Sequence, residues 1–544
     1  MSKILLALVL AFANIVANAA APKVLEPPLR AHLAFLADDL LEGRGTGQRG
    51  GDISVAYLES QLVSLGLQPV KGNSFKQKVN LVGSQLLPNS KVTFSVAGQT
   101  ISPQLGEQIV VGNSTGSTDL VLDAPLVFVG YGVRAPEENW DDFKGMSLKG
   151  KILLAMVNDP QATAKEPDRF AGKSLTYYGR WTYKFEEARR QGAAGILLIH
   201  TNASASYGWN VPRTSFSHER FSSEKGGNPI EGWLQEDQTS ALLRAAGVSL
   251  DELRALAESR EFVARELPIS VHAELHSQVR KIVQFNVLGM VPGTDAKLKT
   301  EAVVYSAHWD HLGVVDMQGA GSGTVKQIWN GAVDNASGSA ALLAMAQAAI
   351  TRPAKRTQIF LWPCAEEQYL LGSEAYVNDP PWPLAKTAAD LNLDSMNFVG
   401  ETRDIGVAGS ERSSLFASAK RVAKQMGLKI APTVPDLGGA YFRADHFNFA
   451  RAGVPAFNVG SAVFSGDGHF EYVEDEANSE KKSAQQMRAF KNDYHTVRDR
   501  YDPNWNLKGM LQQAQFTLNL GWDIANAREM PTWGKGQAFG LIKR

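Results

Sequence analysis

Five short segments of the sequence place acidic or histidine side chains where divalent metals and proton transfer need them. In the first, AVVYSAHWDHLG (302–313), an apolar run leads into His308, Asp310 and His311. The others, in chain order, are NGAVDNASG with Asp334, LWPCAEEQYLLGS with Glu366 and Glu367, ADLNLDSMN with Asp394, and YHTVRD with His495. Together these side chains favour a hydrolase that uses two metal ions.

The number of side chains fits what such a site needs. Two divalent metals a few ångströms apart can activate a water and stabilise the oxyanion formed when a peptide bond is cleaved. They need a bridging carboxylate, further ligands on each ion, and a base that is not a ligand. We assign His308 and Asp394 to one ion, Glu367 and His495 to the other, and Asp334 to the bridge.

Two carboxylates are left over for proton transfer and orientation. Glu366 is the predicted general base, because one of two adjacent side chains at a strand end can coordinate while the other faces the substrate water. Asp310 is predicted to hydrogen-bond the ring of His308 and to fix its tautomer.

Each of these residues also has a plainer structural interpretation. Asp334, which precedes Asn335, could be simply the N-terminal cap of a helix. The pair Glu366–Glu367 could be a solvated charge pair, and Asp394 a buried structural carboxylate. The functional interpretation rests on their order and on their shared position after apolar runs.

The elements around these segments predict an α/β fold. From about residue 279, strand-like and helix-like patterns alternate, which indicates a mixed central sheet with helices on both faces. Open sheets of this kind place their chemistry at the carboxyl ends of the strands. Upstream, residues 28–67 predict two helices separated by the loop EGRGTGQRGG, and residues 75–112 predict short strands.

Residues 115–272 are predicted to form a separate, inserted α/β domain. Strand-like and helix-like stretches alternate there, but no cluster of acidic or histidine residues follows its strands. The domain is either a lid or recruiter that restricts access by larger substrates, or a stabilising insertion without substrate contact. The predicted domains are a signal peptide (1–19), an N-terminal part of the main domain (20–114), the insertion (115–272) and the main domain proper (273–544).

Composition and the N-terminus limit partners and location. The 544 residues carry a formal net charge of −1, so the chain shows no basic footprint for nucleic acid. Lys3, an apolar run to Val16 and Ala17-Asn18-Ala19 form the pattern of a secretory signal peptide, with a buried helix as the alternative. The mature protein is therefore expected to be secreted or periplasmic, without a membrane span. Cys364, the only cysteine, excludes an intrachain disulfide and is expected to be a buried thiol.

The motifs resemble a known family. AHWDHLG, NGAVDNASG, AEEQYLLGS, NLDSMN and YHTVRD are similar to the five metal-site motifs of the di-zinc aminopeptidases, whose relatives include the glutamate carboxypeptidase II and transferrin-receptor-like proteins. The residues that match the zinc ligands are His308, Asp334, Glu367, Asp394 and His495. The resemblance also implies Glu366 as general base, Asp310 behind the first histidine, and a cis peptide after Asp334.

The resemblance extends over most of the mature chain. LEGRGTGQRG followed by YLESQLVSLGLQP is similar to the family's N-terminal segment, and the insertion resembles the protease-associated domain of many members. RADHFNFARAGVPAF resembles the segment near the substrate pocket, and Tyr441 is the candidate for the tyrosine that stabilises the oxyanion in relatives. Trp309, Tyr369 and Ala444 depart from the family's usual residues, which bears on pocket shape.

The resulting expectation is an exported two-zinc exopeptidase with a peptide substrate, most simply an aminopeptidase. Acidic residues predominate near the motifs, whereas a carboxypeptidase needs an arginine for the substrate carboxylate, and Arg412 and Arg443 are the nearby candidates. A carboxypeptidase, a one-zinc glutaminyl cyclase and a non-catalytic receptor-like protein are the alternatives. The donor set would also accept cobalt or manganese. Sequence alone gives no oligomeric state.

Overall fold

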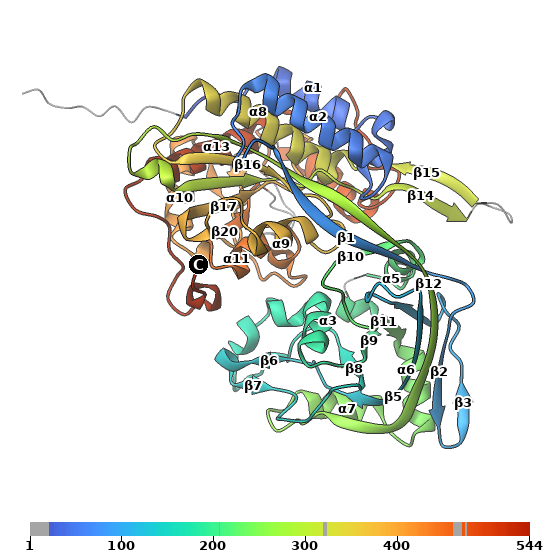
Figure 1. Cartoon of the computed structure of the whole chain (residues 1–544). Helices are drawn as coiled ribbons and strands as arrows, with labels where there is room; N and C mark the ends of the chain where they lie inside the picture. Colours follow the sequence, from blue (N-terminus) through green and yellow to red (C-terminus); the bar gives the residue numbers. More distant parts are fainter. Residues whose placement is uncertain (1–20, 206, 319–323, 461–470, 474–475) are drawn as a thin grey trace, which may run out of the picture.

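One strand, β12 (Arg265–Val291), runs through the whole molecule and joins its two lobes (Figure 1). A computed structural model describes residues 21–205, 207–318, 324–460, 471–473 and 476–544. The expected signal peptide, residues 1–19, lies outside the described residues. Among those described, no helix has the length and apolar character required to cross a membrane.

The larger lobe is built on a mixed sheet. Its strand order is β20-β17-β13-β16-β12, and β1 pairs with the other edge of β12. The strands β20, β17, β13 and β16 are parallel, whereas β12 is antiparallel to β16. Their bounds are β1 (Lys76–Leu86), β13 (Ala302–Ser306), β16 (Thr357–Trp362), β17 (Thr387–Asn392) and β20 (Ala456–Asn458).

Helices cover both faces of this sheet, as predicted, because its strands are apolar on both sides. In β13, Val303 and Tyr305 pack into the core beneath one helical layer, while Val304 packs into a second core on the opposite face. The first layer contains α1 (Glu26–Leu36), α2 (Arg49–Leu65), α8 (Ser337–Thr351) and α13 (Lys508–Asn526). The opposite face carries α9 (Leu371–Asn378) and α11 (His446–Arg451).

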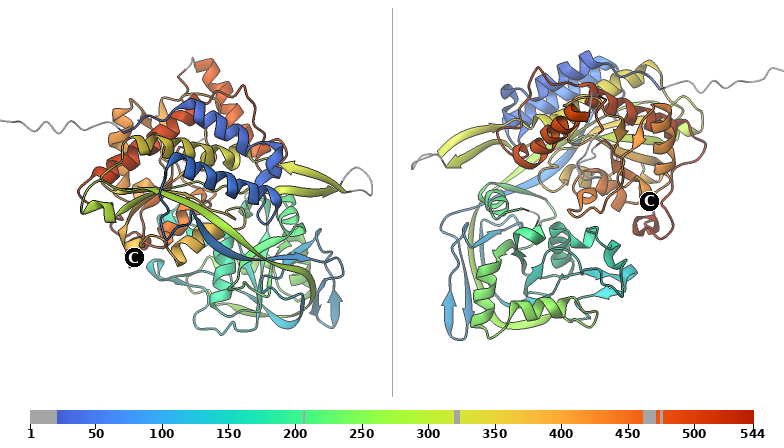
Figure 2. Two further views of the ribbon diagram at one scale, coloured as in Figure 1. Left: turned by 45° about the horizontal axis from the view of Figure 1, so that its top comes forward. Right: turned by 180° about the vertical axis from the view of Figure 1, so that it is seen from behind.

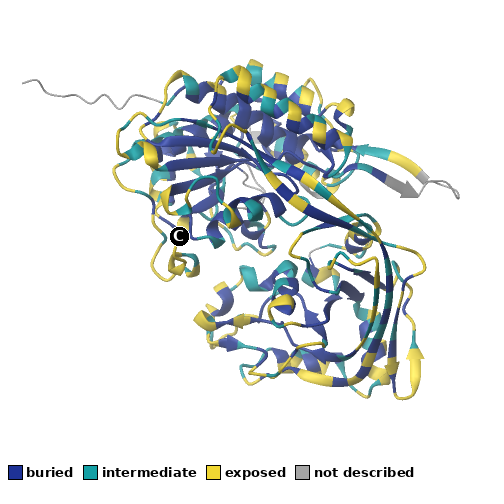
Figure 3. Cartoon of the chain, in the orientation of Figure 1, coloured by how far each residue is buried: buried dark blue, intermediate teal, exposed yellow. Residues whose placement is uncertain are grey.

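Helix α8 is the central element of the first layer. It packs against α1 and α13, and almost all of its side chains are buried (Figure 3). This explains its alanine-rich sequence, since a helix enclosed by neighbours is apolar all round and small side chains permit close approach. The amino end of α8 is thereby held at the carboxyl edge of the sheet.

The smaller lobe has its own sheet and its own cores. The first half of β12 continues into the order β5-β8-β9-β11-β4, with β5, β8, β9 and β11 parallel. Its main strands are β2 (Lys91–Val96), β3 (Gln99–Ile101), β4 (Ile109–Gly112), β5 (Asp119–Phe128), β8 (Ile152–Met156), β9 (Gly195–His200) and β11 (Ile230–Gln235). Its main helices are α3 (Trp181–Arg190), α5 (Asn210–Ser217), α6 (Glu236–Ala245) and α7 (Leu250–Ala257).

The structure places the junction between the lobes differently from the expected boundaries at 115 and 272. Strands β2 to β4 precede residue 115 yet belong to the sheet of the smaller lobe. At the other end, no loop separates the lobes, because Val271, Ala273 and Leu275 keep β12 extended by burying alternate side chains in the smaller lobe. Residue 272, the expected boundary, therefore lies inside one continuous strand.

The lobes touch again away from β12 (Figure 2). The Leu175 amide donates to the Asp436 carbonyl at 2.8 Å, and Arg451 pairs with Glu186 at 3.0 Å. Further elements of the larger lobe are the hairpin β14 (Gly313–Gln318) and β15 (Thr324–Trp329), α10 (Leu415–Gln425) and α12 (Glu476–Arg488). A ring contact between Trp181 of α3 and Tyr369, in the loop after β16, brings the smaller lobe beside the carboxyl edge of the main sheet.

Candidate functional site

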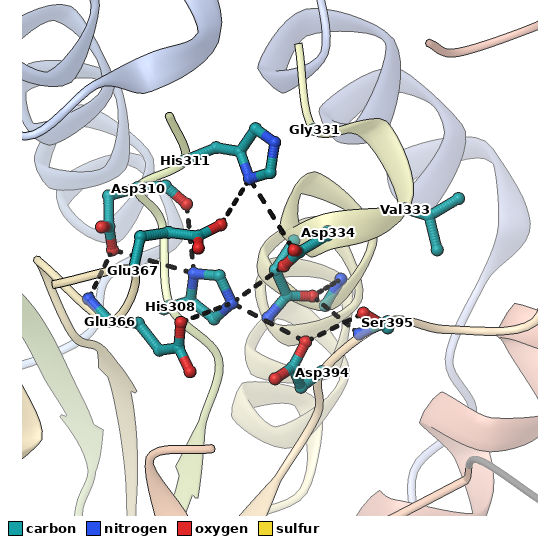
Figure 4. A network of polar contacts seen from close by, with 12 residues as sticks. His308, Asp310, His311, Gly331, Val333, Asp334, Glu366, Glu367, Asp394 and Ser395 are labelled. Atoms are coloured by element: carbon teal, nitrogen blue, oxygen red, sulfur yellow. Dashed lines mark hydrogen bonds and ion pairs between the residues drawn. The ribbon is translucent and has the colours of Figure 1, made fainter. Parts of the chain in front are cut away.

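The predicted ligands come together at the carboxyl edge of the main sheet. Figure 4 shows four of them, and His495 joins them through its contacts with Asp334 and Glu367. His308 follows β13, Glu366 and Glu367 follow β16, and Asp394 follows β17. Because these three strands are parallel neighbours, their ends meet at one edge, and residues far apart in sequence become adjacent.

Asp334 enters from the turn before α8 rather than from a strand end. Its peptide bond to Asn335 is cis, as the resemblance implied. The turn is held by Asp499, whose carboxylate accepts the Val333 amide at 2.8 Å and the Asp334 amide at 3.0 Å. Asp499 belongs to the same YHTVRD segment as His495, so one segment supplies a candidate ligand and orients another.

The first group of candidate ligands surrounds the ring of His308. Its Nε2 lies 3.3 Å from Asp334 Oδ1, 3.7 Å from Asp394 Oδ1 and 3.9 Å from Glu366 Oε2. His308 is buried, and its Nε2 has no hydrogen-bond partner within the described part of the chain. A buried donor or acceptor without a partner is costly, so this nitrogen is suited to a ligand between the carboxylates.

The second group lies on the other oxygen of Asp334. His495 Nε2 is 3.2 Å from Asp334 Oδ2 and 3.0 Å from Glu367 Oε2. His311, which was not assigned a role from the sequence, joins this group: its Nδ1 is 2.6 Å from Glu367 Oε1 and 3.8 Å from Asp334 Oδ2. The only signal in the sequence is its place three residues after His308.

These two groups fit a pair of divalent ions. Imidazole nitrogens and carboxylate oxygens are the donors that zinc accepts, and Asp334 offers one oxygen to each group. His308 and Asp394 would hold one ion, while Glu367 and His495 would hold the other. The close approach of several buried carboxylates also calls for a compensating positive charge.

The electrostatics of the site separate the two adjacent glutamates. Burial and the charges of Asp394 and Glu367 hold the pKa of Glu366 well above its usual range, against the opposing effect of His308. For Glu367, burial acts in the same direction, but His495 and His311 outweigh it and bring the pKa to about 2. In this arrangement Glu366 holds a proton more readily than Glu367, whose carboxylate stays ionised.

Asp310 connects the segment of His308 to the segment of Glu366, although its carboxylate does not bond the ring of His308 as predicted. The ring Nδ1 of His308 lies 3.1 Å from the Asp310 backbone carbonyl and 3.7 Å from its carboxylate. That carboxylate instead accepts the Glu366 amide at 3.1 Å and the Thr46 hydroxyl at 3.2 Å. Asp310 thus fixes the backbone of Glu366 as well as the loop that carries His308.

Tyr441 has no contact with these groups among the described interactions. Its side chain is buried and its hydroxyl donates to the Ala456 carbonyl at 2.9 Å, so its expected role at the oxyanion stays a prediction. Tyr494 stacks on the ring of His495 with centroids 3.8 Å apart. Tyr494 is 49% exposed, so its ring lies at the surface of the second ligand group. Sequence reasoning missed Tyr494, which directly precedes a predicted ligand.

The smaller lobe reaches the rim of the site. The ring of Trp181 meets that of Tyr369, two residues after Glu367, with centroids 4.9 Å apart. The neighbouring Arg180 is buried, its Nε has no partner among the described residues, and its Nη1 lies 3.5 Å from the Gly438 carbonyl. Arg443 donates to the same carbonyl at 2.8 Å. The pKa of Arg180 falls to about 9 through burial and the adjacent charge of Arg443.

Cys364 lies two residues before Glu366 and takes no part in this network. It is fully buried, and burial together with the charge of Asp310 raises the pKa of its thiol well above the ordinary value. A thiol that stays protonated is a poor nucleophile and a poor metal ligand, in agreement with the prediction.

Comparisons with known proteins agree with the fold and the motifs. Residues 286–518, which hold all the candidate ligands, match the description of peptidase family M28. These residues therefore form an M28 peptidase domain, and the resemblance to the di-zinc aminopeptidases is confirmed over that part of the chain.

The relatives cover most of the chain. The aminopeptidase YwaD of Bacillus subtilis (strain 168) is 24% identical over 418 residues, or 74% of each protein. Among solved structures, an aminopeptidase from Aneurinibacillus sp. strain AM-1 has a TM-score of 0.52 at 16% identity, covering 93% of this chain and 95% of that one. A structure titled as a zinc aminopeptidase from Bacillus subtilis has a TM-score of 0.43 at 17% identity, covering 92% and 96%. The Aneurinibacillus structure supports the two-lobed fold.

Proposed function

We propose that this chain is a two-metal exopeptidase that removes N-terminal residues from peptides. The observation that carries the proposal is the pair of ligand groups that share Asp334, with Glu366 beside them. The M28 domain supports peptide hydrolysis, and the Bacillus subtilis relative is named as an aminopeptidase. Zinc is the proposed metal because the donors are imidazoles and carboxylates.

In this proposal, Glu366 carries the proton. Bound zinc would supply a Lewis acid and lower the pKa of a bound water. Glu366 accepts a proton from the attacking water and delivers it to the amine that leaves, a task suited to a carboxylate whose pKa lies above the usual range. Asp310 holds the Glu366 amide and so keeps the side chain at the edge of the first ligand group.

Tyr494 is the proposed donor to the oxyanion. Its ring is fixed against His495, and a tyrosine hydroxyl is protonated at neutral pH, so that it can donate to the oxygen that becomes negative during attack.

One observation favours the alternative, a carboxypeptidase of the same fold. Arg180 and Arg443 place two guanidinium groups on the Gly438 carbonyl, and the Nε of the buried Arg180 has no partner among the described residues. Guanidinium groups with unused donors can bind a substrate carboxylate. The aminopeptidase remains our first proposal because the groups nearest the metals are acidic and suit a free amine.

The test is a panel of peptides blocked at one end. An aminopeptidase cleaves leucine or alanine anilides with a free amine and leaves their N-acetylated forms intact. A carboxypeptidase cleaves N-blocked peptides with a free C-terminus and ignores the anilides. Cleavage only of substrates with both ends free would indicate that Arg180 and Arg443 bind the C-terminal carboxylate of short peptides.

A non-catalytic, receptor-like protein is the alternative from a different class. It would not need the complete ligand set together with Glu366, all of which this chain retains. Metal analysis of the purified protein distinguishes the two, since a protein that is purified without metal and cannot be loaded with it would not be the proposed enzyme.

We also propose export and a role for the insertion in substrate access. The pattern of residues 1–19 motivates export, and N-terminal sequencing of the mature protein tests it, with a start near Ala20 expected. The contact between Trp181 and Tyr369 motivates the access role for the smaller lobe.

A further inference from the structure

The glycine-rich segment that precedes α2 has no role in the proposed chemistry, yet it lies against the metal loops. Arg44, in the middle of this segment, is completely buried. Its Nε donates to the Trp309 carbonyl at 2.8 Å and its Nη2 to the Gly331 carbonyl at 2.8 Å. Its Nη1 donates to the carbonyls of Asn330 at 2.6 Å and Leu36 at 2.7 Å.

Three of these four bonds join the two loops that define the bridged site, and the fourth reaches the end of α1. Trp309 lies between His308 and Asp310, and Gly331 lies three residues before Asp334. The guanidinium group thus ties the loop of the first histidine directly to the loop of the bridging aspartate. No other described side chain is bonded to both of these carbonyls.

The neighbours of Arg44 hold the same loop. The Arg44 carbonyl accepts the His311 amide at 3.3 Å, and the Thr46 hydroxyl donates to Asp310 at 3.2 Å. Gln48 accepts the Val314 amide at 2.8 Å. Residues 44–48 therefore contact the stretch from Trp309 to Val314 at several successive positions.

The glycines explain how the segment comes so close. At Gly43, φ is +67°, and a Cβ would lie 2.2 Å from the Trp329 carbonyl oxygen. At Gly45, a Cβ would lie 2.9 Å from the Gly313 Cα. Side chains at either position would push the segment away from the β14–β15 hairpin and move Arg44 out of reach of its carbonyls.

Arg44 is bonded only to neutral carbonyls and has no carboxylate among its hydrogen-bond partners. Burial lowers its pKa to about 10, while Asp499, Asp334 and Asp310 favour its charge from farther away. The forked geometry of arginine can serve four acceptors at once, whereas a lysine ammonium has three donors around one point. The four bonds of Arg44 therefore depend on the forked shape of its guanidinium group and not only on its charge.

We propose that Arg44 is a positioning residue that sets the spacing of His308 and Asp334 and thereby raises the affinity for both metal ions. The inference rests on the proposed two-metal function. A positioning role and a purely electrostatic role predict opposite changes in zinc affinity when Arg44 is replaced. If Arg44 acted only through its positive charge, it would repel the metal ions, and replacing it would tighten zinc binding. If Arg44 holds the two loops in position, replacing it weakens zinc binding.

The test compares metal affinity and thermal stability in full-length variants. Arg44→Met, Arg44→Lys and Thr46→Val are each stripped of metal and titrated with zinc against a chromophoric chelator. Arg49→Met is the matched control, because Arg49 is the first residue of α2, directly after the segment, is largely exposed and pairs only with Glu42 among the described residues. Unfolding midpoints are measured for each protein with and without zinc.

The expected result is zinc affinity lower by roughly 10- to 100-fold in Arg44→Met, the range found for groups that orient metal ligands. Arg44→Lys should recover part of this loss, and Thr46→Val should show a smaller one. The zinc-induced rise in the unfolding midpoint should shrink in the same order and stay normal in Arg49→Met.

Two results would overturn the inference. One is tighter zinc binding in Arg44→Met, which would assign Arg44 a purely electrostatic role. The other is unchanged affinity with an equal loss of stability in the metal-free and loaded forms, which would make it an ordinary structural residue. If Arg44→Met does not fold, Arg44→Lys and Thr46→Val decide by the same criteria. A wild-type protein that binds two zinc ions but cleaves no peptide would refute the proposed function and leave the Arg44 result valid.

Discussion

The different roles proposed for the two adjacent glutamates follow from their different surroundings. Glu367 faces His495 and His311, which keep it ionised, whereas Glu366 faces Asp394 and other carboxylates, which favour its protonated form. Their roles are set by the side chains that the fold brings to them, since the two residues are chemically identical.

Replacing Glu366 by Gln should lower kcat by at least about 100-fold, the scale of general acid–base catalysis, and leave the metal content unchanged. Glu367→Gln should instead reduce metal content, because a ligand of the second group is weakened. Steady-state kinetics and elemental analysis of both variants check this. Near-normal turnover in Glu366→Gln would show that the base has been assigned to the wrong residue.

Replacing Tyr494 and replacing Tyr441 by Phe should have different effects. Tyr494→Phe should lower kcat by about 100-fold or more if it removes a donor to the oxyanion. Tyr441→Phe should leave kcat unchanged and cost about 1 kcal/mol of stability, since it removes one buried hydrogen bond to Ala456. Kinetics and chemical denaturation of the pair measure both effects. A fall in kcat confined to Tyr441→Phe would support Tyr441 in this role instead.

At the scale of elements, the sequence predicted the strand ends but not the way in which distant segments complete them. The runs before His308, Glu366 and Asp394 are apolar and short, so strands ending in ligands could be recognised directly. Arg44 and Arg180 could not be assigned in this way, because their partners are backbone carbonyls of loops hundreds of positions away. Backbone acceptors leave no pattern in sequence.

A buried histidine in helix α11, His446, should make the stability of the protein depend on pH. Burial of His446 lowers its pKa to about 3, compared with 6.5 for an exposed ring. Between these values the unfolded chain binds one more proton than the folded chain, so stability falls as pH decreases from 6.5 to 3. Replacement by Gln should remove this contribution, which amounts to about 1 to 2 kcal/mol between pH 6.5 and pH 5.

The measurement is chemical denaturation of metal-free wild type and His446→Gln at a series of pH values. Using the difference between the two proteins cancels the titration of the other histidines. Parallel pH dependences would mean that His446 is not held neutral in the folded protein.

For the whole molecule, the shared strand β12 makes the lobes covalently and structurally continuous, while their cores remain separate. The fold class was predictable from the alternation of strands and helices. The junction was not, because an extended segment looks the same in sequence whether it ends one sheet or passes into the next. The mutual position of the lobes depends on contacts such as Arg451 with Glu186, which become visible only in three dimensions.

Metal removal should therefore affect the lobes unequally. Chelation should speed amide hydrogen exchange in the loops after β13, β16 and β17, because their carboxylates lose the charge that holds them together. Strands β8 and β9 of the smaller lobe contribute no candidate ligand and should keep their protection. Exchange followed by mass spectrometry measures this, and equal loosening of both lobes would show that the metals stabilise the molecule as one unit.

The most direct test of the account is the number of metal ions that Asp334 holds. Metal-free protein is titrated with zinc while bound metal and peptidase activity are followed together, for wild type, Asp334→Asn and Asp394→Asn. A two-metal centre bridged by Asp334 should bind two zinc ions per wild-type chain, with both bound more weakly in Asp334→Asn and one bound more weakly in Asp394→Asn. Full activity with a single bound ion, or loss of only one ion in Asp334→Asn, would contradict a shared two-metal centre.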